Sequence, residues 1–206
     1  MDWDEVIVGL KADMEFKHKA REQALQLCRQ LIQACSKCIK HVHRGQYTEA
    51  SAILDEARSI RDKCAEALRP HGELYYAGYL QDAEKEFVEA AVTLAMVTGA
   101  ALPTQAELAV QTSVYLNGAA EAASECRRAA LDRMRHGQLD EAERLLEGMV
   151  TVYEDLATFD FPDSLTGGLR RTNDALRAVV ERTRSDLTLT RVQHDLMEEL
   201  RAAKSP

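Results

Sequence analysis

The chain has 206 residues and a net charge of -8, from 34 acidic and 26 basic side chains. That length suits one domain with a sizeable core. Only 10 Gly and 4 Pro interrupt it, which excludes the many tight turns of an all-β or α/β fold. No apolar run approaches the roughly 18 residues that cross a bilayer, and the acidic start is unlike a signal peptide. We therefore expect an all-α protein of one domain, residues 1–206, located in the cytoplasm and without membrane contact.

Apolar residues recur every three or four positions along most of the chain, which is the pattern of amphipathic helices. Gly45, Gly99 and Gly137 follow three of these stretches, as glycines do at helix ends. The pattern predicts helices over 3–43, 48–68, 73–98, 104–108, a long helix ending at 136, 139–158 and 170–203. The clear loop is 161–168. Because short connections favour antiparallel neighbours, we expect an antiparallel bundle of six or seven helices.

Five cysteines are spread through the predicted helices. Cys35 and Cys38 have the CxxC spacing of many zinc sites, but the nearby His41 and His43 belong to the same helix and point in different directions. An odd number of cysteines in helices is typical of reduced thiols packed as small apolar side chains. We therefore predict buried thiols rather than a disulfide framework or a structural zinc site.

Two turns share the motif Gly-Gln-apolar-x-Glu-Ala, at Gly45–Ala50 and at Gly137–Ala142. The motif is similar to the turn inside tetratricopeptide hairpins. The two copies are 92 residues apart, whereas those repeats recur about every 34 residues. We interpret both as the same way of ending one helix and starting the next.

The charge is segregated along the chain. Residues 17–44 sum to +6, from seven Lys or Arg and one Glu, whereas residues 45–164 sum to -12. An ordinary solvated helix face explains the basic segment without any function. The alternative is a surface that contacts phosphates on an otherwise acidic protein.

Carboxylates are grouped on two of the predicted helices. Asp82, Glu86 and Glu89 fall within a sector of about 60° on the helix over 73–98, between two apolar stripes. Glu121 and Glu125 lie one turn apart on the next long helix. Two such groups could bind Mg²⁺ or Mn²⁺, which take oxygen ligands and can activate water beside a phosphoryl group. A solvated or salt-bridged face is the alternative, since glutamate is common at exposed helix positions.

Other catalytic patterns are absent from the sequence. It has no glycine-rich phosphate loop and no Gly-x-Ser-x-Gly nucleophile elbow. A ferritin-like di-metal centre needs Glu-x-x-His on two helices, and only Glu15–His18 has that form. We therefore expect no organic cofactor.

Five motifs, in order along nearly the whole chain, resemble the translin/TRAX family, and most closely its TRAX-like single proteins of prokaryotes. They are Ile39-x-x-x-His43-Arg-Gly45, Glu86-Phe-Val-Glu-Ala90, Tyr115-Leu-x-Gly-x-Ala-Glu121-x-x-x-Glu125, Gly168-Leu-Arg-Arg-x-x-Asp174 and Glu181-Arg-Thr-Arg-x-Asp186. The resemblance implies an all-α subunit of a closed homo-oligomer, commonly an octameric shell that binds nucleic acid on its inner surface. TRAX supplies a metal-dependent endoribonuclease activity, whereas translin binds nucleic acid and largely lacks the catalytic carboxylates.

The resemblance also implies the site residues. The Glu-x-x-Glu pair of TRAX falls on Glu86 and Glu89, and its Asp-x-x-x-Glu pair falls on Glu121 and Glu125. These four are the expected catalytic and metal-binding residues, with Mg²⁺ or Mn²⁺ as the cofactor. Glu121 departs from the family Asp, and its extra methylene would displace a metal by roughly an ångström, which can cost about 100-fold in rate.

The expected ligand is single-stranded RNA, with single-stranded DNA as the second candidate. Four basic residues of the first helix are expected to hold its backbone, namely Arg21, Lys37, Lys40 and Arg44. Two other functions remain open at this point. One is a translin-like protein that binds RNA or single-stranded DNA without cutting it, and the other is a helical adaptor without nucleic-acid affinity.

Overall fold

The computed structural model describes residues 2–204, and within that range every element of regular structure is a helix. Six helices are long, and three are single turns. The long ones are α1 (Trp3–His43), α2 (Tyr47–Leu68), α4 (Tyr79–Thr98), α6 (Thr112–Arg135), α7 (Leu139–Leu156) and α9 (Leu169–Lys204). The short ones are α3 (Gly72–Tyr75), α5 (Gln105–Leu108) and α8 (Asp163–Thr166). The predicted all-α fold is confirmed.

The boundaries differ from the prediction at two places. The predicted helix over 73–98 is divided into α3 and α4, because Gly78 has a left-handed φ of 97°. The Gln81 side chain fixes this turn: its Oε1 accepts from the Gly78 N–H at 3.1 Å and its Nε2 donates to the Tyr75 carbonyl at 2.8 Å. The predicted loop over 161–168 contains the single turn α8, which Gly167 ends at a φ of 61°.

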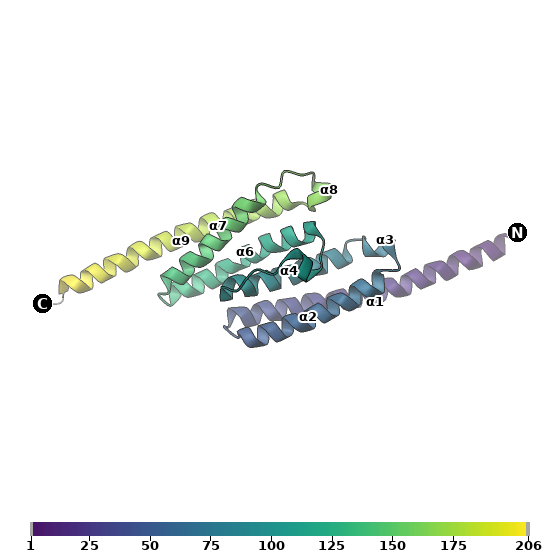
Figure 1. Cartoon of the computed structure of the whole chain (residues 1–206), viewed down its shortest axis with the longest axis horizontal. Helices are drawn as coiled ribbons and strands as arrows, with labels where there is room; N and C mark the ends of the chain where they lie inside the picture. The colour runs from purple at the N-terminus through teal and green to yellow at the C-terminus, as the bar shows by residue number, and fades with distance from the viewer. Residues whose placement is uncertain (1, 205–206) are drawn as a thin grey trace.

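The helices are arranged as three adjoining pairs (Figure 1). The hairpin of α1 and α2 lies along one edge, α4 and α6 occupy the middle, and α7 and α9 lie on the opposite edge. α4 packs against α1, α2 and α6, and α6 also packs against α7 and α9. The central pair is therefore covered from both sides, which explains why α4 carries much of the core, including Phe87, Val88 and Val92.

A glycine sets the distance between α4 and α6. A Cβ added to Gly118 would lie 2.6 Å from the Val88 Cβ and 2.8 Å from the Lys85 carbonyl oxygen. These distances are shorter than real Cβ contacts, so the two backbones approach as closely as they do because position 118 has no side chain. Small residues continue along α6, where Ala119, Ala120, Ala122 and Ala123 are all buried.

The predicted burial of the cysteines is confirmed. All five are buried and free. Cys28 and Cys64 join α1 to α2 with their sulfur atoms 3.4 Å apart, and the Cys38 thiol donates to the Ala50 carbonyl at 3.3 Å. The thiols of Cys28, Cys38 and Cys64 therefore pack at the interface between the first two helices.

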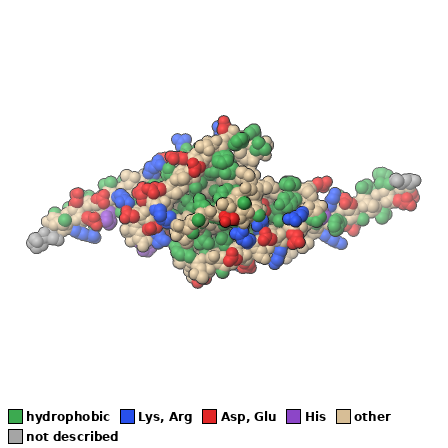
Figure 2. All heavy atoms as spheres, viewed as in Figure 1, with side chains coloured by type: hydrophobic (Ala, Val, Ile, Leu, Met, Phe, Trp, Pro, Cys, Tyr) green, Lys and Arg blue, Asp and Glu red, His purple; other side chains and the backbone are tan. Residues whose placement is uncertain are grey.

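The ends of α1 and α9 project from opposite sides of the body (Figures 1 and 2). Both projections carry large exposed apolar side chains, namely Trp3, Val8, Leu10, Met14 and Phe16 on α1 and Leu189, Val192, Leu196, Met197 and Leu200 on α9. None of the helices described over residues 2–204 has the length and apolar character needed to cross a membrane.

Candidate metal centre and nucleic-acid interface

The four glutamates predicted as the site lie on facing sides of α4 and α6, beside the close approach at Gly118. All four are half-buried. Burial, with repulsion from Glu86, Glu121 and Glu125, raises the pKa of Glu89 to about 7. Burial and repulsion from Glu121 also raise the pKa of Glu86. The structure thus brings the two carboxylate pairs together, and we call them the acidic cluster.

α1 closes one side of the acidic cluster. Burial, with smaller contributions from Cys38, Glu86 and Glu89, raises the pKa of the Cys35 thiol. At the end of α1, His43 Nε2 lies 2.6 Å from Glu125 Oε1, and the ring is only 2% exposed. Three helices therefore surround the carboxylates, and this enclosure explains the desolvation that shifts Glu86 and Glu89.

Two members of the acidic cluster are paired with basic side chains. Lys85 Nζ lies 2.8 Å from Glu121 Oε1, and His43 holds Glu125 as described above. Glu86 and Glu89 make no hydrogen bond or ion pair with any residue of the described range. Half of the cluster therefore has a basic partner, and the other half consists of crowded carboxylates without a direct partner.

The donor chemistry of the acidic cluster fits a hard divalent cation, because carboxylate oxygens are its preferred ligands. A cation would also relieve the repulsion that raises the pKa of Glu89. Over residues 2–204, however, no three His, Cys, Asp or Glu side chains converge closely enough to hold a metal ion. Lys85 and His43 engage one oxygen each of Glu121 and Glu125, respectively, so a cation bound by all four glutamates would use the remaining oxygens or displace these partners.

Asp82 lies outside the acidic cluster. It is exposed, one turn before Glu86, and lines a separate polar pocket with Lys85, Ser113 and Asn117. It is not among the groups that shift the pKa of Glu86 or Glu89. The third acidic residue of the predicted sector is thus directed toward the start of α6 rather than toward Glu125.

Three of the four predicted nucleic-acid-binding residues share one face at the end of α1, and the fourth does not. Lys37, Lys40 and Arg44 are exposed and fall within a sector of about 60° at the end of α1. Arg21 lies about 100° or more from that sector around the helix. Its guanidinium pairs with Glu22 at 2.6 Å and stacks on the Tyr79 ring at 5.5 Å. The basic residues of α1 therefore form no continuous stripe.

Comparison with proteins of known structure decides the family. AfC3PO in complex with duplex RNA matches with a TM-score of 0.85 and 34% identity, over 91% of this chain and 97% of that one. A crystal structure of AfC3PO matches at 0.84, with the same identity and coverage. The chain belongs to the translin/TRAX family. The predicted resemblance is therefore confirmed.

Two further comparisons give more distant similarities. Apo-NeC3PO shares the translin/TRAX fold with a TM-score of 0.81 at 19% identity, over 89% of this chain and 96% of that one. An uncharacterized protein of Methanocaldococcus jannaschii is 28% identical over 172 residues, which are 83% of this chain and 76% of that protein. A scan of protein-family models finds no match.

The two basic partners of the acidic cluster in this translin/TRAX protein were not predicted from the sequence. Lys85 is adjacent to Glu86 in sequence, and His43 stands in a motif quoted only for the family resemblance. The lysine offered a signal, because a single positive charge lies within an acidic run of α4. The histidine offered none, since its contact with Glu125 depends on how α1 packs against α6.

Proposed function

We propose that this translin/TRAX protein is a metal-dependent endoribonuclease that hydrolyses phosphodiester bonds of single-stranded RNA inside a homo-oligomeric shell. The acidic cluster carries the proposal. Four half-buried carboxylates face one another, and burial together with repulsion among them raises the pKa of Glu89 to about 7. Clusters of perturbed carboxylates are typical of catalytic and metal sites. The structure of AfC3PO with duplex RNA supports RNA as the ligand class.

Each residue of the acidic cluster has a role in this proposal. Glu86, Glu89 and Glu121 hold Mg²⁺ or Mn²⁺, and Glu125 either binds the metal or orients the attacking water. When bound, the cation would neutralise charge on the scissile phosphate and lower the pKa of a water molecule. Lys85 and His43 orient two of the carboxylates. Lys37, Lys40 and Arg44 hold the RNA backbone together, and Arg21 holds it at a separate position on α1.

The projecting ends of α1 and α9 support the homo-oligomer. Each projection exposes several large apolar side chains. Monomeric proteins rarely expose such groups together, and these surfaces mark contacts with another protein. Copies of the same chain are the proposed occupants, arranged as a closed shell such as an octamer. In that arrangement the acidic clusters would face an enclosed space.

Cleavage of a labelled single-stranded RNA tests the catalytic proposal. The wild type should release products with Mg²⁺ or Mn²⁺ and stop when a chelator is added. Glu89→Gln should lose at least about 100-fold in rate, because a ligand is removed from the metal. Glu56→Gln is the matched control, since it makes the same change at an exposed position of α2. Equal cleavage by Glu89→Gln and the wild type would exclude the catalytic role of the cluster.

A second candidate function is a translin-like protein that binds RNA or single-stranded DNA without cutting it. It is favoured by the pairing of Glu121 with Lys85 and of Glu125 with His43, which leaves no three ligands converged. This function predicts salt-sensitive binding that weakens in Lys40→Ala, with no metal-dependent products. The absence of affinity for single-stranded or duplex RNA at low salt would instead indicate a helical adaptor.

A further inference from the structure

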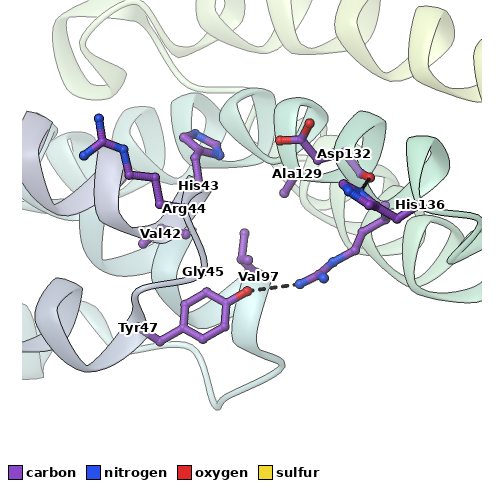
Figure 3. Close-up of a pocket in the computed structure, with 10 residues that line it drawn as sticks. Val42, His43, Arg44, Gly45, Tyr47, Val97, Ala129, Asp132 and His136 are labelled. Atoms are coloured by element: carbon purple, nitrogen blue, oxygen red, sulfur yellow. Dashed lines mark hydrogen bonds between the residues drawn. The ribbon is translucent and has the colours of Figure 1, made fainter.

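A cavity of about 300 Å³ adjoins the acidic cluster at His43, which lines the cavity (Figure 3) and contacts Glu125. It lies where the ends of α1, α4 and α6 meet the start of α2. Its polar lining comes from His43, Arg44, Tyr47, Asp132, Arg133 and His136. Val42, Val97 and Ala129 form its apolar wall. The volume is at the lower end of the range of ligand pockets, which suits a small group such as a phosphate with part of its sugar.

The cavity has an excess of positive charge. Arg44 pairs with no carboxylate of the described residues. Arg133 donates only to neutral oxygens, at 3.0 Å to the Tyr47 hydroxyl (Figure 3) and at 3.0 Å to the Gln138 amide. The one carboxylate in the lining, Asp132, pairs at 3.2 Å with Arg135, which lies outside the cavity. Arg44 and Arg133 therefore line the cavity without a carboxylate partner. The Arg44 side chain extends away from Tyr47 (Figure 3), so its guanidinium would turn inward to reach a ligand held there.

His43 is the wall between this cavity and the acidic cluster. Its Nε2 contacts Glu125, and its ring lines the cavity. Its Nδ1 is buried and has no hydrogen-bond partner within residues 2–204. A buried polar atom without a partner costs free energy, so a ligand that reached this ring nitrogen would recover part of that cost.

We propose that this cavity is a phosphate-binding subsite for RNA, formed by Arg44 and Arg133 with His43 at its inner wall. Guanidinium groups bind phosphate through paired hydrogen bonds, and the cavity is half open, so a phosphate can enter it from solvent. The subsite rests on the proposed endoribonuclease function, because its position beside Glu125 places a second phosphate of the same strand near the acidic cluster. That phosphate is either a 5′-terminal monoester or an internal diester.

A structural role for the two arginines makes a different prediction. Arg44 caps the end of α1 and Arg133 lies in the last turn of α6, where a positive charge favours the helix dipole. If that were their whole role, Arg133→Gln and Arg44→Gln would lower the melting temperature and leave ligand binding unchanged.

Fluorescence anisotropy with two 12-nucleotide single-stranded RNAs, identical except for a 5′-phosphate, tests the subsite in the presence of a chelator. Arg133→Gln and Arg44→Gln should each weaken binding about tenfold, with circular dichroism confirming the fold. Loss for both RNAs identifies an internal phosphate, and loss confined to the phosphorylated RNA identifies the terminal one. Arg128→Gln, an exposed arginine of α6 outside the cavity, is the matched control. Wild-type affinity in both cavity variants would overturn the proposal.

Calorimetric titration of inorganic phosphate distinguishes a failure of this proposal from a failure of the proposed endoribonuclease activity. Binding by the wild type and its loss in Arg133→Gln would establish the subsite even in a protein that does not cleave RNA. Normal RNA cleavage by the wild type, together with no phosphate binding, would overturn the subsite alone.

Discussion

At the scale of single residues, two glutamates of α4 have pKa values raised to about 7 for different reasons. Glu84 is 2% exposed, and burial raises its pKa against the opposing effect of Arg61. Glu89 is less buried, and repulsion from three other carboxylates adds to its desolvation. The first is a buried carboxyl beside an arginine of the core, whereas the second belongs to a group that a cation would stabilise.

The raised pKa of Glu89 predicts how stability depends on pH. Its ordinary value is 4.5, so between pH 4.5 and 7 the native state binds more protons than the unfolded chain. The free energy of unfolding should therefore fall as the pH rises through this window. Glu89→Gln removes the ionisable group and should reduce that fall by about 1 to 3 kcal/mol. Urea denaturation of both proteins from pH 5 to pH 8 measures the difference.

Two features make this pH experiment specific. Glu84 titrates in the same direction and is present in both proteins, so the variant should retain part of the slope. Glu56→Gln removes an exposed carboxyl of α2 and should keep the full slope. An identical slope in Glu89→Gln and the wild type would mean that burial and repulsion do not raise the pKa of Glu89 as the structure indicates.

At the scale of helices, the contact between α4 and α6 positions the acidic cluster. Gly118→Ala would place a Cβ 2.6 Å from the Val88 Cβ and 2.8 Å from a backbone oxygen, neither of which can move cheaply. We expect a loss of about 1 to 3 kcal/mol in the free energy of unfolding, because overpacking forces the two helices apart. The same separation should reduce RNA cleavage, since the two carboxylate pairs move away from each other.

A second helical glycine provides the control for this substitution. A Cβ on Gly148 of α7 would meet only the terminal methyl of Met96, at 3.2 Å, and that side chain can shift. Gly148→Ala should therefore be neutral or stabilising, by up to about 1 kcal/mol, through helix propensity. Chemical denaturation compares the two variants. Equal effects would show that the tight contact at Gly118 does not control the spacing of α4 and α6.

The helix scale also shows how far the sequence could predict this molecule. The spacing of Glu86, Glu89, Glu121 and Glu125 determined which carboxylates share a face, because a helix has a fixed period. The pairing of Glu125 with His43 could not be predicted, since residues 82 positions apart meet only through the packing of α1 on α6. The break at Gly78 was missed because one glycine within a helical pattern is usually tolerated.

At the scale of the whole molecule, the net charge of -8 conceals an uneven distribution. The middle of the chain is acidic and contains the cluster, whereas the end of α1 carries Lys37, Lys40 and Arg44 together. The uncompensated arginines of the cavity extend this basic region to the end of α6. A polyanion can therefore approach the acidic centre along a positive surface, provided that cations shield the carboxylates.

The projecting end of α9 tests the assembly of the shell. Leu189, Val192 and Leu196 recur at helical spacing and are 60%, 62% and 54% exposed, so they form an apolar stripe. Leu196→Glu places a charge on that stripe in every copy of the chain, and we expect it to shift the oligomer to smaller species. Size-exclusion chromatography with light scattering measures the mass. The fold of each subunit should be retained, because the replaced side chain is already exposed.

His194→Glu adds the same charge on the opposite side of the helix and should leave the mass unchanged. A wild-type mass in Leu196→Glu would show that this stripe takes no part in assembly.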